Sequence, residues 1–251
     1  MYQERAYRRY MGWDDGVCFK VQEKETDLWV ALDAQSYGRY GGKLEDFILK
    51  EIKKLRRELE QYIIRDEGFY SSLVPYSVKK DAPLSVRKMA EAAAVAGVGP
   101  MAAVAGLFAQ HVGEKILEKV QCKKLIVENG GDIFLYSHEP VTLSVFAGKS
   151  PLSEKIGLRL EPRGKLGVCT SSGTVGHSLS FGLADAVVVV CKDAVLADAY
   201  ATAKCNRVKD KEDIDRVLAT ARKSFGILGI LIVFDKYLGA WGDLELISLQ
   251  A

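Results

Sequence analysis

The chain has 251 residues, of which 48% are hydrophobic and 27% are charged, and its formal net charge at pH 7 is +2. This composition is typical of a globular protein with a sizeable core, and so small a net charge gives no reason to expect a nucleic-acid partner. A chain of this length commonly forms one unit, so we expect a single domain over residues 1–251.

The cysteines and the N-terminal sequence indicate the compartment. The five cysteines are an odd number and form no CxxC pair, which argues against both a disulfide framework and a zinc ribbon. The first residues, "MYQERAYRRYMGWDDG", lack the apolar core and the cleavage site of a signal peptide. We therefore expect a cytoplasmic protein with reduced thiols.

The first half of the chain has mainly helical patterns. Val17 to Leu32 contains two β-type runs around a polar middle, which predicts a hairpin. Leu44 to Ile63 has apolar residues at helical spacing and predicts a long amphipathic helix with a solvated charged face. Further helices are expected over Ser85 to Ala96 and from Pro100 to about Lys119.

One uncharged stretch, Ala92 to Gly113, has the length of a membrane span. It consists mostly of Ala and Gly and is interrupted at "GVGP", which makes it weakly hydrophobic and broken. We interpret it as two buried helix segments around a bend, and we expect no membrane partner.

The second half of the chain has mainly strand patterns. The expected strands are "KKLIV", "DIFLYS", "VTLSVFAG", "IGLRLEP", "DAVVVVC", "ILGILIVFD" and "LELISL". Two helices interrupt them, one capped by Asp193 and one over about Asp213 to Lys223. Because helices cluster early and strands cluster late, the sequence predicts an α+β fold with antiparallel sheets and helices packed on them.

The first candidate site is the turn in "VENGGDIFL", which includes Asn129, Gly130, Gly131 and Asp132. A hairpin turn that needs glycine accounts for this sequence without any ligand. Alternatively, the two glycines let a ligand approach the backbone closely, and Asp132 supplies a negative charge for a metal or a hydroxyl.

The second candidate site is "GVCTSSGTVGHS", Gly167 to Ser178, which we interpret as one loop. Its small hydroxyl-bearing residues could donate hydrogen bonds to a phosphate or to a carbonyl-rich ring, although most loops of this composition are simply polar surface. The same loop contains His177, which has no second histidine at helical spacing and so predicts no zinc site.

The third candidate site is the helix that contains "ADAYATA". Asp198 and Thr202 stand four residues apart on one stripe, together with Val195 and Cys205. A carboxylate and a hydroxyl one turn apart can supply two of the six oxygen ligands of Mg²⁺. The alanines around them allow close packing on either a sheet or a ligand.

Taken in order, these three segments resemble a known family. "ENGGDI", "CTSSG" and "ADAYATA" are similar to the GGD strand turn, the TSG loop and the ADALATA-like helix of the ApbE family. That family comprises flavin transferases that use FAD and Mg²⁺ to attach FMN to a Ser or Thr of a target protein. With "AGVGPMAAVAG" and "TSSGTVGHSLSFGLADA", nearly the whole chain resembles an ApbE-like sub-family of bacteria and archaea.

The resemblance implies a fold and a set of site residues. The fold would be an ApbE-like T-fold, with Asp198 and Thr202 as Mg²⁺ ligands and with Asp198 and His177 as the catalytic residues. The residues implied to bind FAD are Asn129, Gly130, Gly131, Asp132, Thr170, Ser171, Ser172 and Gly173. The paired histidines of the family are absent, because the corresponding stretch reads "VGHSLSFGLADA" and leaves only His177.

Three functions remain open on these residues. The first is an Mg²⁺-dependent flavin transferase or FAD pyrophosphatase. The second is sulfur transfer in anaerobic cysteine or homocysteine metabolism, which would use Cys169 or Cys205 as a thiolate. The third is a flavin- or nucleotide-binding protein without catalysis. In each case the expected partner is a small molecule, and a homo-oligomer is compatible with the sequence.

Overall fold

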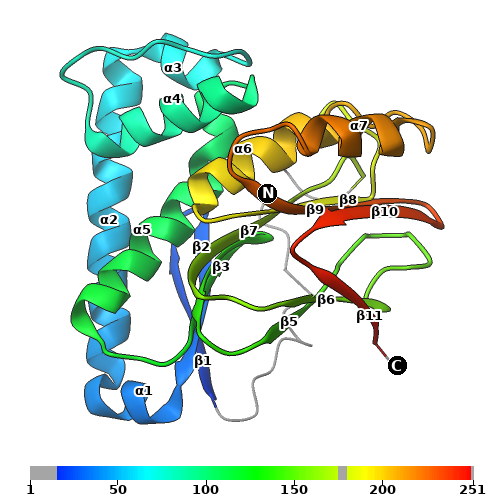
Figure 1. The fold of residues 1–251 in the computed structure, drawn as a ribbon. Coiled ribbons are helices and arrows are strands. Elements are labelled where there is room, and N and C mark those ends of the chain that lie inside the picture. Colours follow the sequence, from blue (N-terminus) through cyan, green and yellow to red (C-terminus); the bar gives the residue numbers. More distant parts are fainter. Residues whose placement is uncertain (1–15, 175–179, 250–251) are drawn as a thin grey trace.

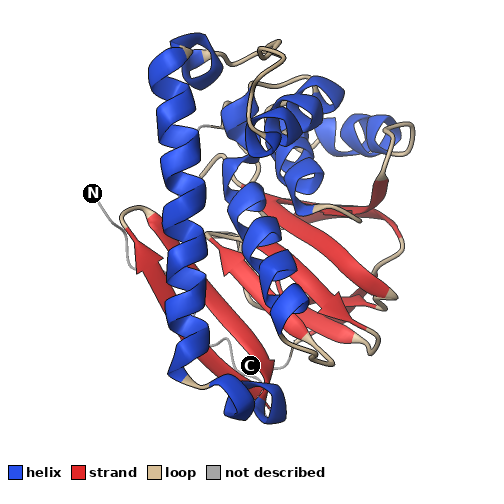
Figure 2. Cartoon of the chain, turned by 90° about the vertical axis from the view of Figure 1, so that its left-hand side faces the viewer, coloured by secondary structure: helices blue, strands red, loops and turns tan. Residues whose placement is uncertain are grey.

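The computed structural model describes residues 16–174 and 180–249. In these residues, helices cover one face of a large antiparallel sheet, and a small sheet covers the other face (Figures 1 and 2). The strands are β1 (Gly16–Glu23), β2 (Thr26–Asp33), β3 (Leu125–Asn129), β4 (Asp132–Ser137), β5 (Val141–Ser144), β6 (Ile156–Leu160), β7 (Gly164–Ser171), β8 (Ala186–Cys191), β9 (Ile227–Phe234), β10 (Tyr237–Gly242) and β11 (Glu245–Ser248). The helices are α1 (Ala34–Tyr40), α2 (Gly42–Arg65), α3 (Glu67–Ser71), α4 (Leu84–Ala96), the 3₁₀ turn η2 (Pro100–Ala103), α5 (Val104–Lys119), α6 (Ala194–Cys205) and α7 (Asp213–Ala221).

The strand order follows from hairpins and from longer connections, among them α6 and α7 between β8 and β9. The large sheet has the order β1-β2-β3-β4-β7-β8-β9-β10, and the small sheet has the order β11-β6-β5. Every neighbouring pair in both sheets is antiparallel. The helices α1 to α5 connect β2 to β3, and the small-sheet strands β5 and β6 lie between β4 and β7 in the chain. This architecture confirms the predicted α+β class.

The central strands are apolar on both faces because both faces of the large sheet are covered. In β8, Val187 and Val189 pack in the core under the helices, whereas Val188 and Val190 pack in the core against the small sheet. Such strands have nearly continuous apolar runs instead of alternating polar and apolar residues. The run "DAVVVVC" therefore identifies a strand in the middle layer.

The uncharged stretch folds as a bend between two buried helices, as predicted. Gly97 ends α4 in the left-handed region, with φ +81°, and Pro100 begins η2. The structure differs from the sequence prediction in that the first turn, Pro100–Ala103, is 3₁₀ and the α-helix begins at Val104. Among the described residues no single helix is long and apolar enough to cross a membrane, and the two helices reach that length only as a pair bent by 102°.

The predicted hairpin, the long amphipathic helix and the Asp193 cap are also confirmed. β1 and β2 pair in register, α2 spans Gly42–Arg65, and the Asp193 side chain accepts a hydrogen bond from the amide of Leu196. Four elements are absent from the sequence prediction: α1, α3, β7 and the edge strand β10.

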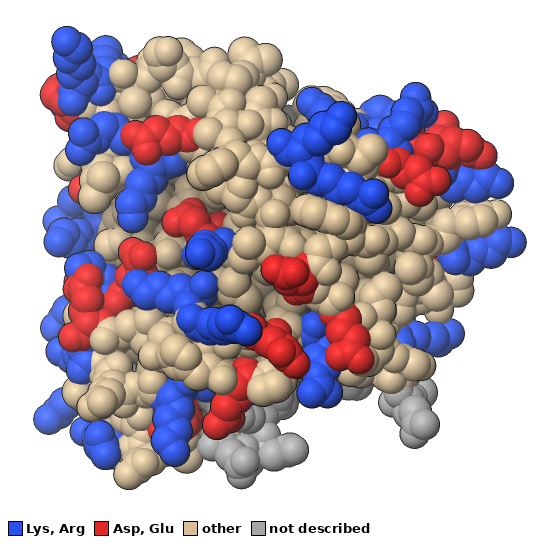
Figure 3. Space-filling view, in the orientation of Figure 1, with Lys and Arg blue, Asp and Glu red and all other residues tan. Residues whose placement is uncertain are grey.

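Charged side chains are mixed on the face seen in Figure 3. Lys and Arg are interspersed with Asp and Glu on this face, and uncharged residues occupy the area between them (Figure 3). Exposed ion pairs of the described residues include Lys24 with Glu60 at 3.1 Å and Lys115 with Glu118 at 2.6 Å. This distribution agrees with the small net charge of the chain.

The contact between α5 and β4 depends on the absence of a side chain at Gly113. A Cβ atom at Gly113 would lie 2.0 Å from Cδ1 of Phe134, a fully buried ring. We expect Gly113→Ala to lower the free energy of unfolding by about 1–3 kcal/mol, because overpacking forces the helix away from the sheet. Chemical denaturation monitored by circular dichroism measures this change.

Gly38→Ala in α1 is the matched control for this prediction. A Cβ atom at Gly38 has no neighbour within 4 Å, so this variant should be neutral or more stable than the wild type. Equal stability of both variants would contradict the proposed close contact between α5 and β4.

Candidate functional site

The turn between β3 and β4 is a two-residue hairpin turn in which both central residues have positive φ. Asn129 pairs with Asp132, and Gly130 and Gly131 have φ values of +69° and +101°. Only glycine adopts such values readily, so turn geometry alone explains both residues. A Cβ atom at Gly131 would make only ordinary contact with Thr170, at 3.7 Å. The glycines of "ENGGDI" are therefore explained without a ligand.

Strand alternation directs the polar side chains of this hairpin toward the helices. Asp132 stands on the same face of β4 as Phe134, which belongs to the core under the helices. Asn129 stands on that face of β3, and its Nδ2 donates to the carbonyl oxygen of Ala105 in the first turn of α5, at 3.2 Å. The turn thus places an amide and a carboxylate beside the N-terminus of α5.

Asp198 reaches the same helix N-terminus from α6. Ala103, at the N-cap position of α5, has no side chain that could accept a hydrogen bond from the first turn. Asp198 supplies the missing acceptor, because its Oδ2 accepts from the amide of Gly106 at 2.8 Å. The helices approach closely at this point, since a Cβ atom at Gly106 would lie 2.3 Å from the carbonyl oxygen of Ala194.

The two carboxyl groups are buried and close enough to affect each other. Asp132 is 7% exposed and Asp198 is 8% exposed. Burial raises the pKa of Asp198 to about 7, although hydrogen bonds from the amides of Gly106 and Ala105 lower it. Burial, and then the charge of Asp198, raise the pKa of Asp132 well above its usual range. Oδ1 of Asp132 has no hydrogen-bond partner among the described residues by distance and angle, while the nearby Cys169 thiol partly offsets the rise in the pKa of this carboxyl group.

A pair of buried hydroxyls lies beside the acidic pair. The hydroxyl oxygens of Ser171, at the end of β7, and Thr202, one turn after Asp198, are 3.3 Å apart. Both residues are buried. Ser171 shares the helix-facing side of β7 with Cys169, so the end of β7 and the middle of α6 face each other. The candidate site therefore combines two carboxyls and two hydroxyls from β4, β7 and α6.

The predicted loop Gly167 to Ser178 is wrong in its first part. Gly167 to Ser171 belong to β7, which pairs with β4 on one side and with β8 on the other. Alternation along this strand places Thr170 on the opposite face from Ser171, with Val168 and away from Asp198. Hydrogen bonds to two neighbouring strands outweigh the loop-like composition of "CTSSG".

Beyond β7, the chain leaves the sheet in an irregular segment. The Ser172 hydroxyl accepts a hydrogen bond from the amide of Thr174, and the amide of Gly173 donates to the carbonyl of Ala184. Thr174 also donates to Asp185 at 3.0 Å. The candidate catalytic residue His177 lies outside the described residues.

The two cysteines proposed for sulfur chemistry are buried thiols. The Cys169 thiol donates to the carbonyl oxygen of Ala194 at 3.3 Å, and burial followed by the charge of Asp132 raises its pKa well above the usual range. Burial also raises the pKa of Cys205. Because the thiolate is the nucleophilic form, these environments do not favour sulfur transfer.

The donor set suits a hard cation better than a transition metal. The part of the chain that the structure describes has no cluster of three or more His, Cys, Asp or Glu side chains arranged to hold a metal ion. Two carboxyls with a hydroxyl are oxygen donors of the kind that Mg²⁺ uses while it keeps several waters. The unpartnered oxygen of Asp132 fits such a cation.

The sequence reasoning missed the contribution of α5. Ala105 and Gly106 complete the site through backbone groups, which no side-chain pattern indicates. The available signal was the helix start itself, since "GVGPMAAVAG" has no Ser, Thr, Asp or Asn that could cap it. A buried helix start without its own cap implies an acceptor from elsewhere in the chain.

A comparison with family models identifies the group to which the chain belongs. A model described as "AbpE bacteria" matches residues 10–234. The chain belongs to this family. Relatives include UPF0280 proteins of Methanocaldococcus jannaschii, 42% identical over 88% of each chain, and of Methanosarcina barkeri, 42% identical over 90% of this chain and 87% of the relative. A UPF0280 protein of Methanospirillum hungatei is 45% identical over 77% of each chain.

Solved structures confirm the ApbE-like fold. The ApbE protein of Thermotoga maritima superimposes with a TM-score of 0.58 at 13% identity, covering 89% of this chain and 96% of that protein. A mutant of the flavin transferase ApbE from Vibrio cholerae gives a TM-score of 0.51 at 16% identity, covering 91% of this chain and 97% of that protein. At these low sequence identities, the match shows that the folds are similar and shows nothing further.

The raised pKa of Asp198 predicts that stability depends on pH. Its folded-state pKa of about 7 lies above the value near 4 of an unfolded Asp, so its contribution is present below about pH 4 and is lost as the pH rises to about 7. We expect the free energy of unfolding of the wild type, relative to Asp198→Asn, to fall by roughly 1 kcal/mol per pH unit in this window.

Denaturation of both proteins with a chelator present, between pH 5 and 8, measures the difference. Asn keeps an oxygen that accepts from the amide of Gly106, so the variant removes the charge of Asp198 together with the effect of that charge on the pKa of Asp132. Parallel profiles for the two proteins would show that Asp198 titrates near its ordinary pKa.

Proposed function

We propose that the protein is an Mg²⁺-dependent FAD-binding enzyme that cleaves the pyrophosphate of FAD, as a flavin transferase or an FAD pyrophosphatase. The observation that carries the proposal is the unpartnered, buried Oδ1 of Asp132 beside the carboxyl group of Asp198. An orphaned carboxylate oxygen in a buried site costs free energy unless a cation or a proton meets it. The Vibrio cholerae neighbour with the same fold is a flavin transferase, which supports this reading.

The residues suited to hold the cation are Asp198, Asp132 and Thr202. Asp198 is held in one orientation by the Gly106 amide, and Thr202 is held near Ser171. When bound, Mg²⁺ would neutralise the pyrophosphate and stabilise charge on the departing phosphate. Both carboxyls would then be charged, because metal ligands must lose their protons.

Neighbouring backbone segments would border the nucleotide. The turn at Gly130–Gly131 exposes backbone without side chains, and Ser172 with Gly173 continues from Ser171. Hydrogen bonds from the hydroxyls and amides of such segments suit phosphate oxygens. Asn129 contributes by holding the first turn of α5 in place.

A second function, flavin or nucleotide binding without catalysis, has one observation in its favour. Asp198 already has a structural role as the acceptor for the first turn of α5. A carboxyl group retained for this cap would persist in a protein that binds FAD and leaves it intact.

The test incubates the purified chain with FAD and Mg²⁺ and measures FMN and AMP by chromatography. We expect release by the wild type and a loss on the order of 100-fold in Asp198→Asn, a size typical for removing one group that stabilises developing charge. The matched control is Asp215→Asn, which removes the same charge from the exposed face of α7. It should cleave FAD like the wild type.

The outcomes separate the two functions. A wild type that binds FAD tightly but releases no FMN or AMP, both alone and with an added acceptor peptide that carries Ser or Thr, would favour the non-catalytic protein. A wild type that neither binds nor cleaves FAD would overturn both. Equal rates for Asp198→Asn and Asp215→Asn would exclude Asp198 from the chemistry.

A further inference from the structure

Helices α5 and α6 each supply a hydrogen-bond acceptor for the N-terminus of the other. The Oε1 of Gln110 in α5 accepts from the amide of Ala194, the first residue of α6, at 2.9 Å. In return, Asp198 in α6 accepts from the amide of Gly106 in the first turn of α5. We call these four residues, Gly106, Gln110, Ala194 and Asp198, the α5–α6 clasp.

The spacing of the clasp fixes the position of α6. Gly106 and Gln110 are four residues apart in α5, and Ala194 and Asp198 are four residues apart in α6. The two hydrogen bonds therefore lie about one helical turn apart, roughly 5–6 Å along each axis. Two bonds with this separation prevent α6 from both sliding along α5 and rotating against it.

The clasp goes beyond ordinary capping. Asp193 already caps α6 with its own side chain, because it accepts from the amide of Leu196 at 3.0 Å. The bond from Ala194 to Gln110 is therefore an additional tether to another helix. A Cβ atom at Gly167 in β7 would lie 2.3 Å from the Cα of Ala194. The start of α6 is therefore packed closely between α5 and β7.

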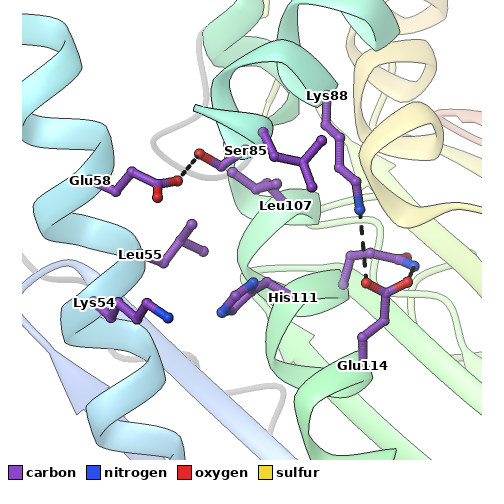
Figure 4. Close-up of a pocket in the computed structure, with 10 residues that line it drawn as sticks. Lys54, Leu55, Glu58, Ser85, Lys88, Leu107, His111 and Glu114 are labelled. Carbon is purple, nitrogen blue, oxygen red and sulfur yellow. Dashed lines mark hydrogen bonds and ion pairs between the residues drawn. The ribbon is translucent and has the colours of Figure 1, made fainter. Parts of the chain in front are cut away.

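Glutamine is suited to this position because it must both accept and donate. Gln110 is 4% exposed, and its Nε2 donates to Oε1 of Glu114 at 2.9 Å. Glu114 in turn lies 3.9 Å from the Lys88 ammonium and 3.8 Å from that of Lys165. Figure 4 shows Lys88 directed toward Glu114 across this region. These contacts fix the orientation of the Gln110 amide.

We propose that Gln110 is a positioning residue for Asp198. By fixing α6 against α5, it keeps Asp198 and Thr202 opposite the side chains that β4 and β7 supply. The role in cation binding rests on the proposed function, whereas the hydrogen bonds of the clasp do not. Partners that orient a metal ligand typically contribute about 10- to 100-fold to metal affinity.

The test compares three variants of the full chain. Gln110→Met keeps the volume and removes both hydrogen bonds. Gln110→Glu keeps an acceptor for Ala194, but it replaces the donor to Glu114 with a second carboxyl group. Ile116→Val is the matched control, because it leaves a small gap on the fully buried side of α5 without touching the clasp.

Two measurements are made on each protein. Amide hydrogen exchange at Gly106 and Ala194 is followed without metal, and Mn²⁺ binding is followed by electron paramagnetic resonance. For Gln110→Met we expect exchange at both amides to accelerate and Mn²⁺ affinity to fall by about 10-fold or more. Ile116→Val should change neither relative to the wild type, and Gln110→Glu should restore part of the protection at Ala194.

The outcomes distinguish this inference from the proposed function. If Gln110→Met matches Ile116→Val in exchange and in Mn²⁺ affinity, Gln110 has no positioning role while the proposed function stands. If the wild type binds no Mn²⁺, the proposed function fails and the cation-positioning role fails with it. Accelerated exchange with unchanged Mn²⁺ affinity would also overturn the inference.

Discussion

The hydrogen bond from the amide of Gly106 to the carboxyl group of Asp198 is the contact on which the site depends. Gly106 is buried in the first turn of α5, which begins after Ala103, a residue that cannot cap it. An unsatisfied buried amide costs about 1–3 kcal/mol, and a buried carboxyl group without a partner costs more. The hydrogen bond between the Gly106 amide and the Asp198 carboxyl group gives each of them a partner. Removing either one would disturb both the α5–α6 packing and the position of the acid.

The same carboxyl group therefore connects the fold to the chemistry proposed for the site. Small residues allow the close approach that this requires, with Gly106 facing the start of α6 and alanines filling much of α6 itself. The three layers then bring Asp132 from the middle sheet to the acid on the helix. Burial keeps water away from both carboxyls, so their charges interact more strongly than they would at the surface.

The conserved architecture and the divergent sequences are compatible for a physical reason. The chain is only 13–16% identical to the ApbE structures yet superimposes over about 90% of its length. A sheet covered on both faces requires apolar strands of suitable size, and many side chains meet that requirement. When sequences differ this much, function depends on the few polar groups at the site. The proposed function therefore rests on Asp132, Asp198 and their partners.

The sequence by itself determined the features that depend on neighbouring residues. The β3–β4 turn, the α6 cap at Asp193 and the long helix α2 all follow from local spacing and turn chemistry. Similarity to a known family predicted the fold and selected Asp198 and Thr202. Tertiary structure alone decided that Gly167 to Ser171 form a strand, because that strand exists through its two neighbours in the sheet.

The partners of the site residues were likewise beyond the reach of local patterns. Gly106 is separated from Asp198 by 92 positions, and Gln110 is separated from Ala194 by 84. A hydrogen bond over such a separation leaves no periodicity in the sequence, and a backbone amide adds no side chain that could be recognised. The sequence therefore specified which carboxyl and hydroxyl side chains the chain has. Only the packing of α5 on α6 decided which groups these side chains contact.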